Sequence, residues 1–306
     1  MLAMINDRAG YNASMSDAVA NDADACLPGI LFVVATPIGN LEDLSPRAAR
    51  VLTEVDLVAV EDTRISRRLA EVTGRLPRMV VLNEHSEQAR VGELIAMVAG
   101  GSSLALVSDA GTPLISDPGF RLVQAAHEAG IQVSPVPGPC AAIAALSAAG
   151  LPSDRFHFEG FLPARGPARR RRLQALAEYP DTLLFYTPAR DLPDVLDDMT
   201  QALGAERLAA LGRELTKRHE TVWRDGLAAL AGRVREDANQ QLGEAVLVVT
   251  GNPAARPPIA LAALARSLAD ELPPSRAAKL LAGLSHLNRR EAFSLIESCR
   301  ASDIER

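Results

Sequence analysis

Four segments of this sequence have the composition of loops that bind a small polar ligand. They begin at Ala35, Glu61, Ser108 and Pro135 and read ATPIGNLED, EDTR, SDAGTPLISDPG and PVPGPCAA. Three of them combine glycine and proline with small polar side chains, so their backbone can approach a ligand closely. The fourth, EDTR, adds two carboxylates and a guanidinium directly after an apolar run.

The segment from Ser108 to Gly119 is the strongest candidate for a cofactor loop. Glycines permit a tight backbone here, while Asp109, Thr112 and Ser116 offer hydrogen bonds. The alternative is a long rigid turn held by its two prolines. About twelve residues of turn chemistry exceed the ~2–6 that usually join a strand to a helix, which favours the cofactor loop.

Candidate acid, base and orienting groups lie in EDTR and in a second segment, RELTKRHE, which begins at Arg213. Asp62 is either a catalytic carboxylate or the N-cap of a helix that begins near Thr63. Arg64 is expected to face a ligand. Glu214 and Glu220 are either acid/base groups or ion-pair partners of the neighbouring cations.

A run of arginines lies near the middle of the chain. Its members are Arg165, Arg169, Arg170, Arg171 and Arg172, and the segment contains no acid. Such a run is either a solvated helix face or a patch that binds phosphate. Arg213, Lys217 and Arg218 add cations farther along that could reach a polyanion.

Strands that alternate with helices must position these segments, which predicts an α/β fold. Ten strands are expected, at 31–35, 57–60, 79–82, 104–107, 131–136, 156–161, 182–186, 207–211, 220–223 and 245–249. The pattern changes near Leu151. We therefore predict a flexible acidic tail over 1–28, α/β domains over 29–152 and 153–255, and a helical region over 256–306, with Ser275 as a helix N-cap. In open α/β sheets, ligands bind beyond the carboxyl ends of the strands, where the four loops begin.

Composition excludes several classes of protein. The 306 residues are 48% hydrophobic and 23% charged, which is typical of a globular protein. The net charge of −6 argues against non-specific coating of nucleic acid. Three scattered cysteines predict a reducing cytoplasm and no metal site. We expect neither a signal peptide nor a membrane span. The GxGxxG and GxxxxGK[ST] fingerprints are absent, which counts against a Rossmann dehydrogenase and a P-loop NTPase.

Taken together, the motifs resemble a known family. ATPIGNLEDL, EDTR, LVSDAGTPLISDPG, PGPCAAIAAL, FEGFLP and RELTKRHE occur in order from Ala35 to Glu220. They resemble the methyltransferases of small-subunit ribosomal RNA within the tetrapyrrole methylase superfamily, the class III S-adenosylmethionine-dependent enzymes. The resemblance covers about residues 29–300. It implies two α/β domains with the cofactor between them, a homodimer, and 2′-O-methylation of cytidine 1402 of 16S rRNA in the small ribosomal subunit.

The resemblance also implies which residues hold S-adenosyl-L-methionine. They are Pro37, Gly39, Asp109, Gly111, Thr112, Pro113, Ile115, Ser116, Pro139, Cys140, Ala141 and Tyr186. Methyl transfer from a sulfonium requires no metal, but a ribose hydroxyl needs help to lose its proton. Candidates for the base are Glu61, Asp62, Glu214 and Lys217, with Arg64 orienting a phosphate. The sequence does not choose among them.

Three other functions stay open. A carbon methyltransferase of tetrapyrrole biosynthesis would share the fold but would not need the arginine run. A non-catalytic sensor would bind the cofactor without turnover. A ribosome assembly factor would bind RNA through its C-terminal helices, and methylation would be incidental.

Overall fold

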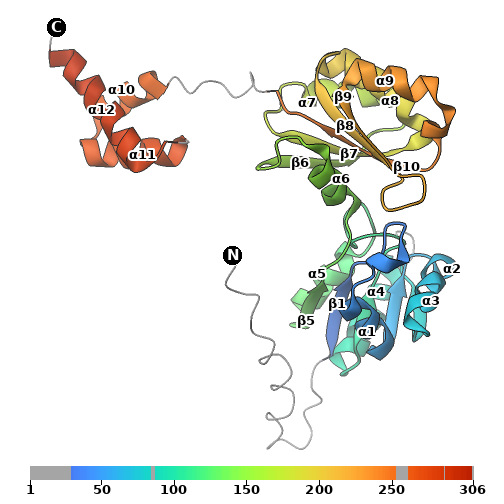
Figure 1. Cartoon of the computed structure of the whole chain (residues 1–306). Coiled ribbons are helices and arrows are strands. Elements are labelled where there is room, and N and C mark those ends of the chain that lie inside the picture. The colour runs from blue at the N-terminus through green and yellow to red at the C-terminus, as the bar shows by residue number, and fades with distance from the viewer. Residues whose placement is uncertain (1–28, 84–86, 253–260, 286, 305–306) are drawn as a thin grey trace, which may run out of the picture. The chain divides into compact units, whose positions relative to one another are not determined.

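The computed structural model describes residues 29–83, 87–252, 261–285 and 287–304. The predicted flexible tail, residues 1–28, lies outside them. The chain divides into two compact units, residues 1–140 and 141–306, which are taken in turn below (Figure 1). The predicted domain limits of 29–152, 153–255 and 256–306 stay predictions.

The first unit is built on a five-stranded parallel sheet. Its strands are β1 (Ile30–Val34), β2 (Leu57–Val60), β3 (Arg78–Val81), β4 (Leu104–Leu106) and β5 (Gln132–Val136). They lie in the order β3-β2-β4-β1-β5. β2 and β4 are apolar and buried along their whole length. Such continuous apolar runs are what a sheet covered on both faces requires.

Helices cover both faces of this sheet with two separate hydrophobic cores. On one face, α1 (Pro46–Glu54), with Ala48, Val51 and Leu52, packs against strand residues such as Val58. On the other, α4 (Glu87–Ala99) and α5 (Phe120–Glu128) pack in a core with Leu31. Short turns complete the unit: η2 (Leu41–Asp43), α2 (Thr63–Ser66), η3 (Arg67–Leu69) and α3 (Ala70–Thr73). Ser45 is the N-cap of α1 and Pro46 its first residue.

The second unit contains a mixed sheet. Its strands are β6 (Phe156–Phe161), β7 (Thr182–Pro188), β8 (Leu208–Arg213), β9 (Thr221–Gly226) and β10 (Glu244–Val249). The order is β6-β7-β10-β8-β9, in which β6 pairs parallel with β7 and every other pair is antiparallel. β6 is therefore an edge strand.

The two faces of the second sheet are covered unequally. α7 (Gly166–Leu176), α8 (Leu192–Leu203) and α9 (Leu227–Glu236) share one large core with Phe185 and Leu247. The opposite face carries α6 (Ala141–Ala149), which packs mainly against β8 and β10. Two short helices, η4 (Ala189–Asp191) and η5 (Ala238–Gln241), connect the remaining elements.

Three helices near the C-terminus have a core of their own. They are α10 (Leu261–Glu271), α11 (Pro274–Leu284) and α12 (Arg289–Ile304), and Ala265, Leu281 and Ile296 are fully buried among them. Arg300 closes the end of α10 by donating to the carbonyls of Ala269 and Leu272. The prediction that Ser275 caps a helix is wrong, because α11 begins one residue earlier and Ser275 lies inside it.

All ten predicted strands are present, with ends that differ by at most three residues from those expected. The α/β fold class is therefore confirmed. None of the helices in the described part of the chain combines the length and the apolar character needed to cross a bilayer.

Candidate functional site

The loops that follow β1 and β4 meet at the point where the sheet reverses its winding. The connection from β1 leads to β2, whereas the connection from the neighbouring β4 leads to β5 on the other side. At the ends of these strands Thr36 and Gly111 form a two-way backbone pair, with N–H···O distances of 2.8 and 3.1 Å. Ligands of open α/β sheets bind at such reversal points.

A third loop joins this pair. The hydroxyl of Thr112 donates to the carbonyl of Pro139, after β5, at 2.9 Å. A Cβ on Gly111 would lie 3.3 Å from the side chain of Ile38 and 3.7 Å from the Pro139 carbonyl, and its φ is +85°. Glycine therefore lets the loops after β1, β4 and β5 form one continuous backbone surface.

The loop from Ser108 to Gly119 is held in a strained conformation. Leu114 and Ser116 have φ values of +73° and +70°, which side chains with a Cβ rarely adopt. Each such residue costs about 1 kcal/mol or more and persists because its surroundings impose it. Ile115 and Ser116 are both exposed in this segment.

Two acids of this loop have raised pKa values. Asp109 accepts a hydrogen bond from the backbone N–H of Asp62 at 3.1 Å, but burial and the nearby Asp62 charge raise its pKa. Burial also raises the pKa of Asp117, despite a hydrogen bond from Ser108. The sequence analysis missed Asp117. Its place in the second half of the same polar loop is the signal that would have found it.

Asp62 is the N-cap of α2, so the capping alternative is confirmed. Its carboxylate accepts from the Arg64 backbone N–H at 2.8 Å and from the Arg64 guanidinium at 2.5 to 3.1 Å. Hydrogen bonds from Arg64 lower the pKa of Asp62 to about 2. The Arg64 side chain is 85% exposed apart from this contact, and Glu61 lies half-buried at the end of β2.

The arginine run divides into buried and exposed members. Arg169 is buried and donates to Asp198 at 2.7 Å, and Arg170 reaches the same carboxylate at 3.2 Å. Arg172 binds Glu159 of β6 at 2.5 and 2.7 Å. Arg165 and Arg171 are exposed, and among the described residues neither side chain takes part in a hydrogen bond or ion pair.

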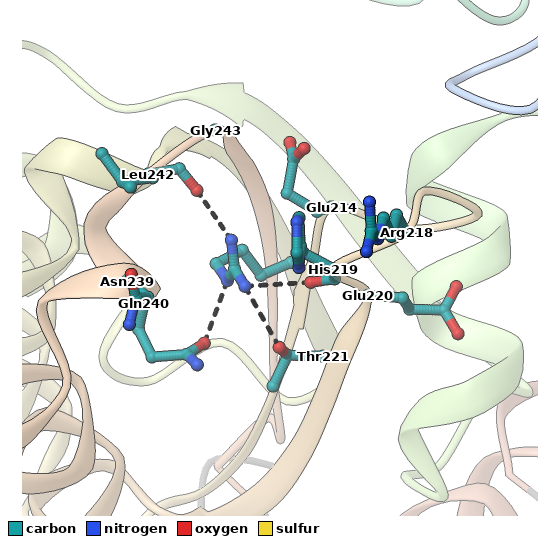
Figure 2. A pocket seen from close by; sticks show the side chains of 10 residues that line it. Glu214, Arg218, His219, Glu220, Thr221, Asn239, Gln240, Leu242 and Gly243 are labelled. Carbon is teal, nitrogen blue, oxygen red and sulfur yellow. Dashed lines mark hydrogen bonds between the residues drawn. The ribbon is translucent and has the colours of Figure 1, made fainter.

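Arg213 is a buried clamp rather than a surface cation. Its guanidinium donates to the side chain of Gln240 at 2.9 Å and to the carbonyls of Leu242 and His219 at 2.8 and 2.9 Å. Figure 2 shows these bonds in the wall of a hollow of about 620 Å³. Arg218, His219 and Glu220 also line this hollow. Arg213 thereby fixes both the loop after β8 and the loop before β10.

Glu214 and Lys217 form a second fixed group beside this hollow. Lys217 Nζ lies 2.8 Å from Glu214 and 3.1 Å from Glu244. Burial alone would raise the pKa of Glu214, but hydrogen bonds from Lys217 and the Glu244 backbone outweigh it and lower the pKa. Burial alone would lower the pKa of Lys217, but its hydrogen bonds to Glu214 and Glu244 outweigh burial and raise the pKa. Glu220 accepts from the Thr216 backbone at 2.7 Å.

The predicted site residues therefore fall into two groups. Pro37, Gly39, Glu61, Asp62, Arg64, the 108–119 loop, Pro139 and Cys140 lie in the first unit. Ala141, Tyr186, Glu214, Lys217 and the arginines lie in the second. There the Tyr186 hydroxyl accepts from the Ala142 N–H at the start of α6, at 3.2 Å. Within the described ranges, no cluster of three or more His, Cys, Asp or Glu side chains is placed to hold a metal ion.

Comparison with known proteins gives a consistent result. Residues 31–231 match the family model described as Tetrapyrrole (Corrin/Porphyrin) Methylases. A protein of Pseudomonas aeruginosa named "Ribosomal RNA small subunit methyltransferase I" is 52% identical over 85% of this chain and 94% of its own. One of the same name from Escherichia coli O157:H7 is 48% identical over 87% and 93%.

Solved structures show the same fold. The uroporphyrin-III-C-methyltransferase of Thermus thermophilus is 25% identical, with a TM-score of 0.51 over 72% of this chain and 94% of that one. A diphthine synthase is 19% identical, with a TM-score of 0.56 over 72% and 89%. Both structures support a common architecture, and at 19% identity the diphthine synthase is evidence for the fold alone.

The buried ion pair of Arg169 can be tested against an exposed arginine on the same helix. Arg169→Leu leaves Asp198 buried with only the half-exposed Arg170, so we expect a loss of about 3 kcal/mol in the free energy of unfolding. Arg171→Leu should change it by less than about 0.5 kcal/mol. Urea unfolding followed by Trp223, the single tryptophan, reports on this unit because Trp223 packs against its core. Equal stability of the two variants would contradict the structural role of Arg169.

The position of Glu214 can be tested through the glycine that it touches. A Cβ on Gly243 would lie 2.2 Å from the Glu214 carboxylate, and its φ is +89°. Gly243→Ala should therefore displace Glu214 and speed hydrogen exchange of the Glu244 N–H that it accepts from. Gly204→Ala is the control, because Gly204 has φ +106° but no atom within 4 Å. If both variants leave that exchange unchanged, Glu214 does not hold the loop.

Proposed function

The chain belongs to the tetrapyrrole methylase family and, within it, to the ribosomal RNA small subunit methyltransferase I group, and from this premise we propose its reaction. It transfers a methyl group from S-adenosyl-L-methionine to the 2′-hydroxyl of cytidine 1402 in 16S rRNA. The observation that carries the proposal is the 52% identity across 94% of a relative that is named as a methyltransferase of small-subunit ribosomal RNA.

The loops after β1, β4 and β5 suit the cofactor. S-adenosylmethionine carries positive charge on its sulfonium and amino groups, and Asp109 and Asp117 place carboxyl groups in the longest of these loops. A Cβ at Gly111 would occupy the narrow space between this loop and the side chain of Ile38. We assign the first-unit part of the site to Pro37, Gly39, Asp109, Gly111, Thr112, Pro113, Ile115, Ser116, Pro139 and Cys140. Ala141 and Tyr186 contribute from the second unit.

The cofactor supplies an activated methyl group, so the chain's task is to orient the ribose and help its hydroxyl lose a proton. The lowered pKa values of Asp62 and Glu214 make both carboxylates weak bases. The raised pKa of Lys217 keeps its ammonium charged, which suits stabilisation of a developing oxyanion. Glu61 stays the candidate base, and Arg64 the group that orients a phosphate.

The RNA contacts that we propose use the exposed cations. Arg165, Arg171 and Arg218 are exposed and free to meet phosphates, and Arg170 and Arg172 add partly neutralised charge. We leave Arg169 and Arg213 out of the RNA-binding set because internal contacts use their guanidinium groups. As further parts of the proposal, the enzyme acts on the small ribosomal subunit in the cytoplasm and is a homodimer.

A methyl-transfer assay tests the proposal directly. Labelled S-adenosylmethionine is incubated with small ribosomal subunits that lack the modification, with naked rRNA and with a tetrapyrrole precursor. We expect label in the 16S rRNA as 2′-O-methylcytidine at position 1402. Label on the tetrapyrrole instead would favour carbon methylation, and cofactor binding without transfer to any substrate would favour a sensor.

Asp109 gives a separate prediction for cofactor binding. Asp109→Asn removes a carboxylate, so we expect the Kd for S-adenosylmethionine to rise about 10- to 100-fold, as loss of a charge-assisted hydrogen bond predicts. Wild-type binding should weaken as the pH falls through the raised pKa of Asp109, above the ordinary value of 3.8, because the neutral acid loses its charge. The variant should lack this component of the pH dependence.

Isothermal titration calorimetry across a pH series measures both effects. Glu128→Gln is the control, because Glu128 is an exposed carboxylate of α5 that accepts a hydrogen bond from Gln124 on the same helix. An unchanged Kd in Asp109→Asn would remove Asp109 from the site.

A further inference from the structure

Phe161 is an exposed aromatic side chain at the end of the edge strand β6. It is 57% exposed, although phenylalanine is scarce in this chain and normally buried. Its position, four residues before Arg165, places it between the sheet and the arginine run. Exposed aromatic rings together with cations on the same surface are a combination that binds single-stranded nucleic acid.

A β-bulge places the Phe161 ring on the same face of the sheet as Phe158 and Tyr186. In the register with β7, Phe158 pairs with Leu184, Gly160 with Phe185 and Phe161 with Tyr186, so Glu159 is an extra residue. Gly160 has φ +74°, a conformation that glycine adopts readily. In a regular strand, residues three positions apart such as Phe158 and Phe161 would lie on opposite faces. With the extra residue, both rings contact Tyr186.

The surroundings of Phe161 are rigid. The rings of Phe158 and Phe161 approach Tyr186 with centroid distances of 4.9 and 5.5 Å, both edge-on. The Tyr186 hydroxyl is held by the Ala142 N–H, and the bulge residue Glu159 is tied to Arg172 of α7. Because its support is fixed, the exposed ring loses little conformational entropy when a planar partner stacks on it.

Charge selects the partner. Glu159 is neutralised by Arg172, while Arg165 and Arg171 stay exposed on the segment that follows Phe161. A second copy that docked symmetrically through the same surface would bring like charges together. An RNA strand supplies both a planar base for the ring and phosphates for the guanidinium groups.

We propose that Phe161 is a stacking platform for an unpaired base of the RNA substrate, with Arg165 contacting the adjoining backbone. This inference rests on the proposed function, because it concerns the substrate of the same site. It adds a substrate-binding side chain that is neither a cation nor a cofactor contact.

The first experiment compares substitutions at the two exposed phenylalanines of β6. Phe161→Leu keeps an apolar side chain without a π-face, and Phe161→Trp keeps the π-face. We expect Phe161→Leu to raise the KM for small ribosomal subunits about 5- to 100-fold, as loss of one stacked base predicts. Phe161→Trp should restore it. Phe156→Leu, at the far end of β6 and 44% exposed, should match the wild type, and the Kd for S-adenosylmethionine should be equal in all four proteins.

The second experiment measures stacking without turnover. Phe161→Trp and Phe156→Trp each add an indole to the background of Trp223. Titration with an oligocytidylate of about ten nucleotides, within the range that such proteins bind, should quench the added fluorescence only at position 161. Arg165→Gln in the Phe161→Trp protein should weaken the quenching and flatten its dependence on salt.

The outcomes separate the two proposals. If the Phe161→Trp protein shows the expected quenching but the wild type transfers no methyl group to rRNA, the proposed reaction fails while the stacking site stands. If transfer occurs and Phe161→Leu keeps the wild-type KM, the stacking site is overturned. The stacking site is also overturned if sedimentation shows that Phe161→Leu changes the oligomeric state, because Phe161 would then contact a second copy.

Discussion

The backbone pair between Thr36 and Gly111 is the interaction on which the first unit's site depends. Parallel strands send the connections of β1 and β4 in opposite directions, so nothing in the sheet itself keeps their loops together. Two hydrogen bonds across the gap do so, and they require a positive φ at Gly111. The contacts of Thr112 with Pro139 and of Asp109 with the Asp62 backbone start from the same loop. Loss of this pair would separate three loops at once.

The second unit fixes its loops by a different means, with buried arginines. Arg213 donates to His219 in the loop after β8, and to Gln240 and Leu242 in the segment that leads into β10. Arg169 similarly ties α7 to Asp198 of α8. A buried guanidinium that satisfies several acceptors can hold irregular backbone that has no sheet partner. Two of the arginines that the sequence predicts to bind RNA, Arg169 and Arg213, therefore stabilise the fold instead.

The sequence predicted the strands well because each is a short apolar run between turn residues. The assignment of a cofactor to the 108–119 loop rests on its unusual composition over twelve residues and stays a prediction. The sequence did not predict which arginines are buried. Helical spacing places Arg169 in line with Leu173 and Leu176, which is a usable signal for a buried face. Its partner Asp198 is 29 residues away, and no local pattern indicates that contact. The bulge at Glu159 was equally hidden, since it depends on the register with β7.

The pairing of these arginines changes how RNA must be held. The five arginines between Arg165 and Arg172 carry five positive charges, but Asp198 and Glu159 cancel two of them. The remaining charge acts within a Debye length of about 8 Å at physiological salt, against a whole-chain charge of −6. Electrostatic attraction alone then gives a weak and salt-sensitive complex. Affinity for one particular strand has to come from contacts that do not depend on charge, and Phe161 provides an exposed surface of that kind at the end of β6.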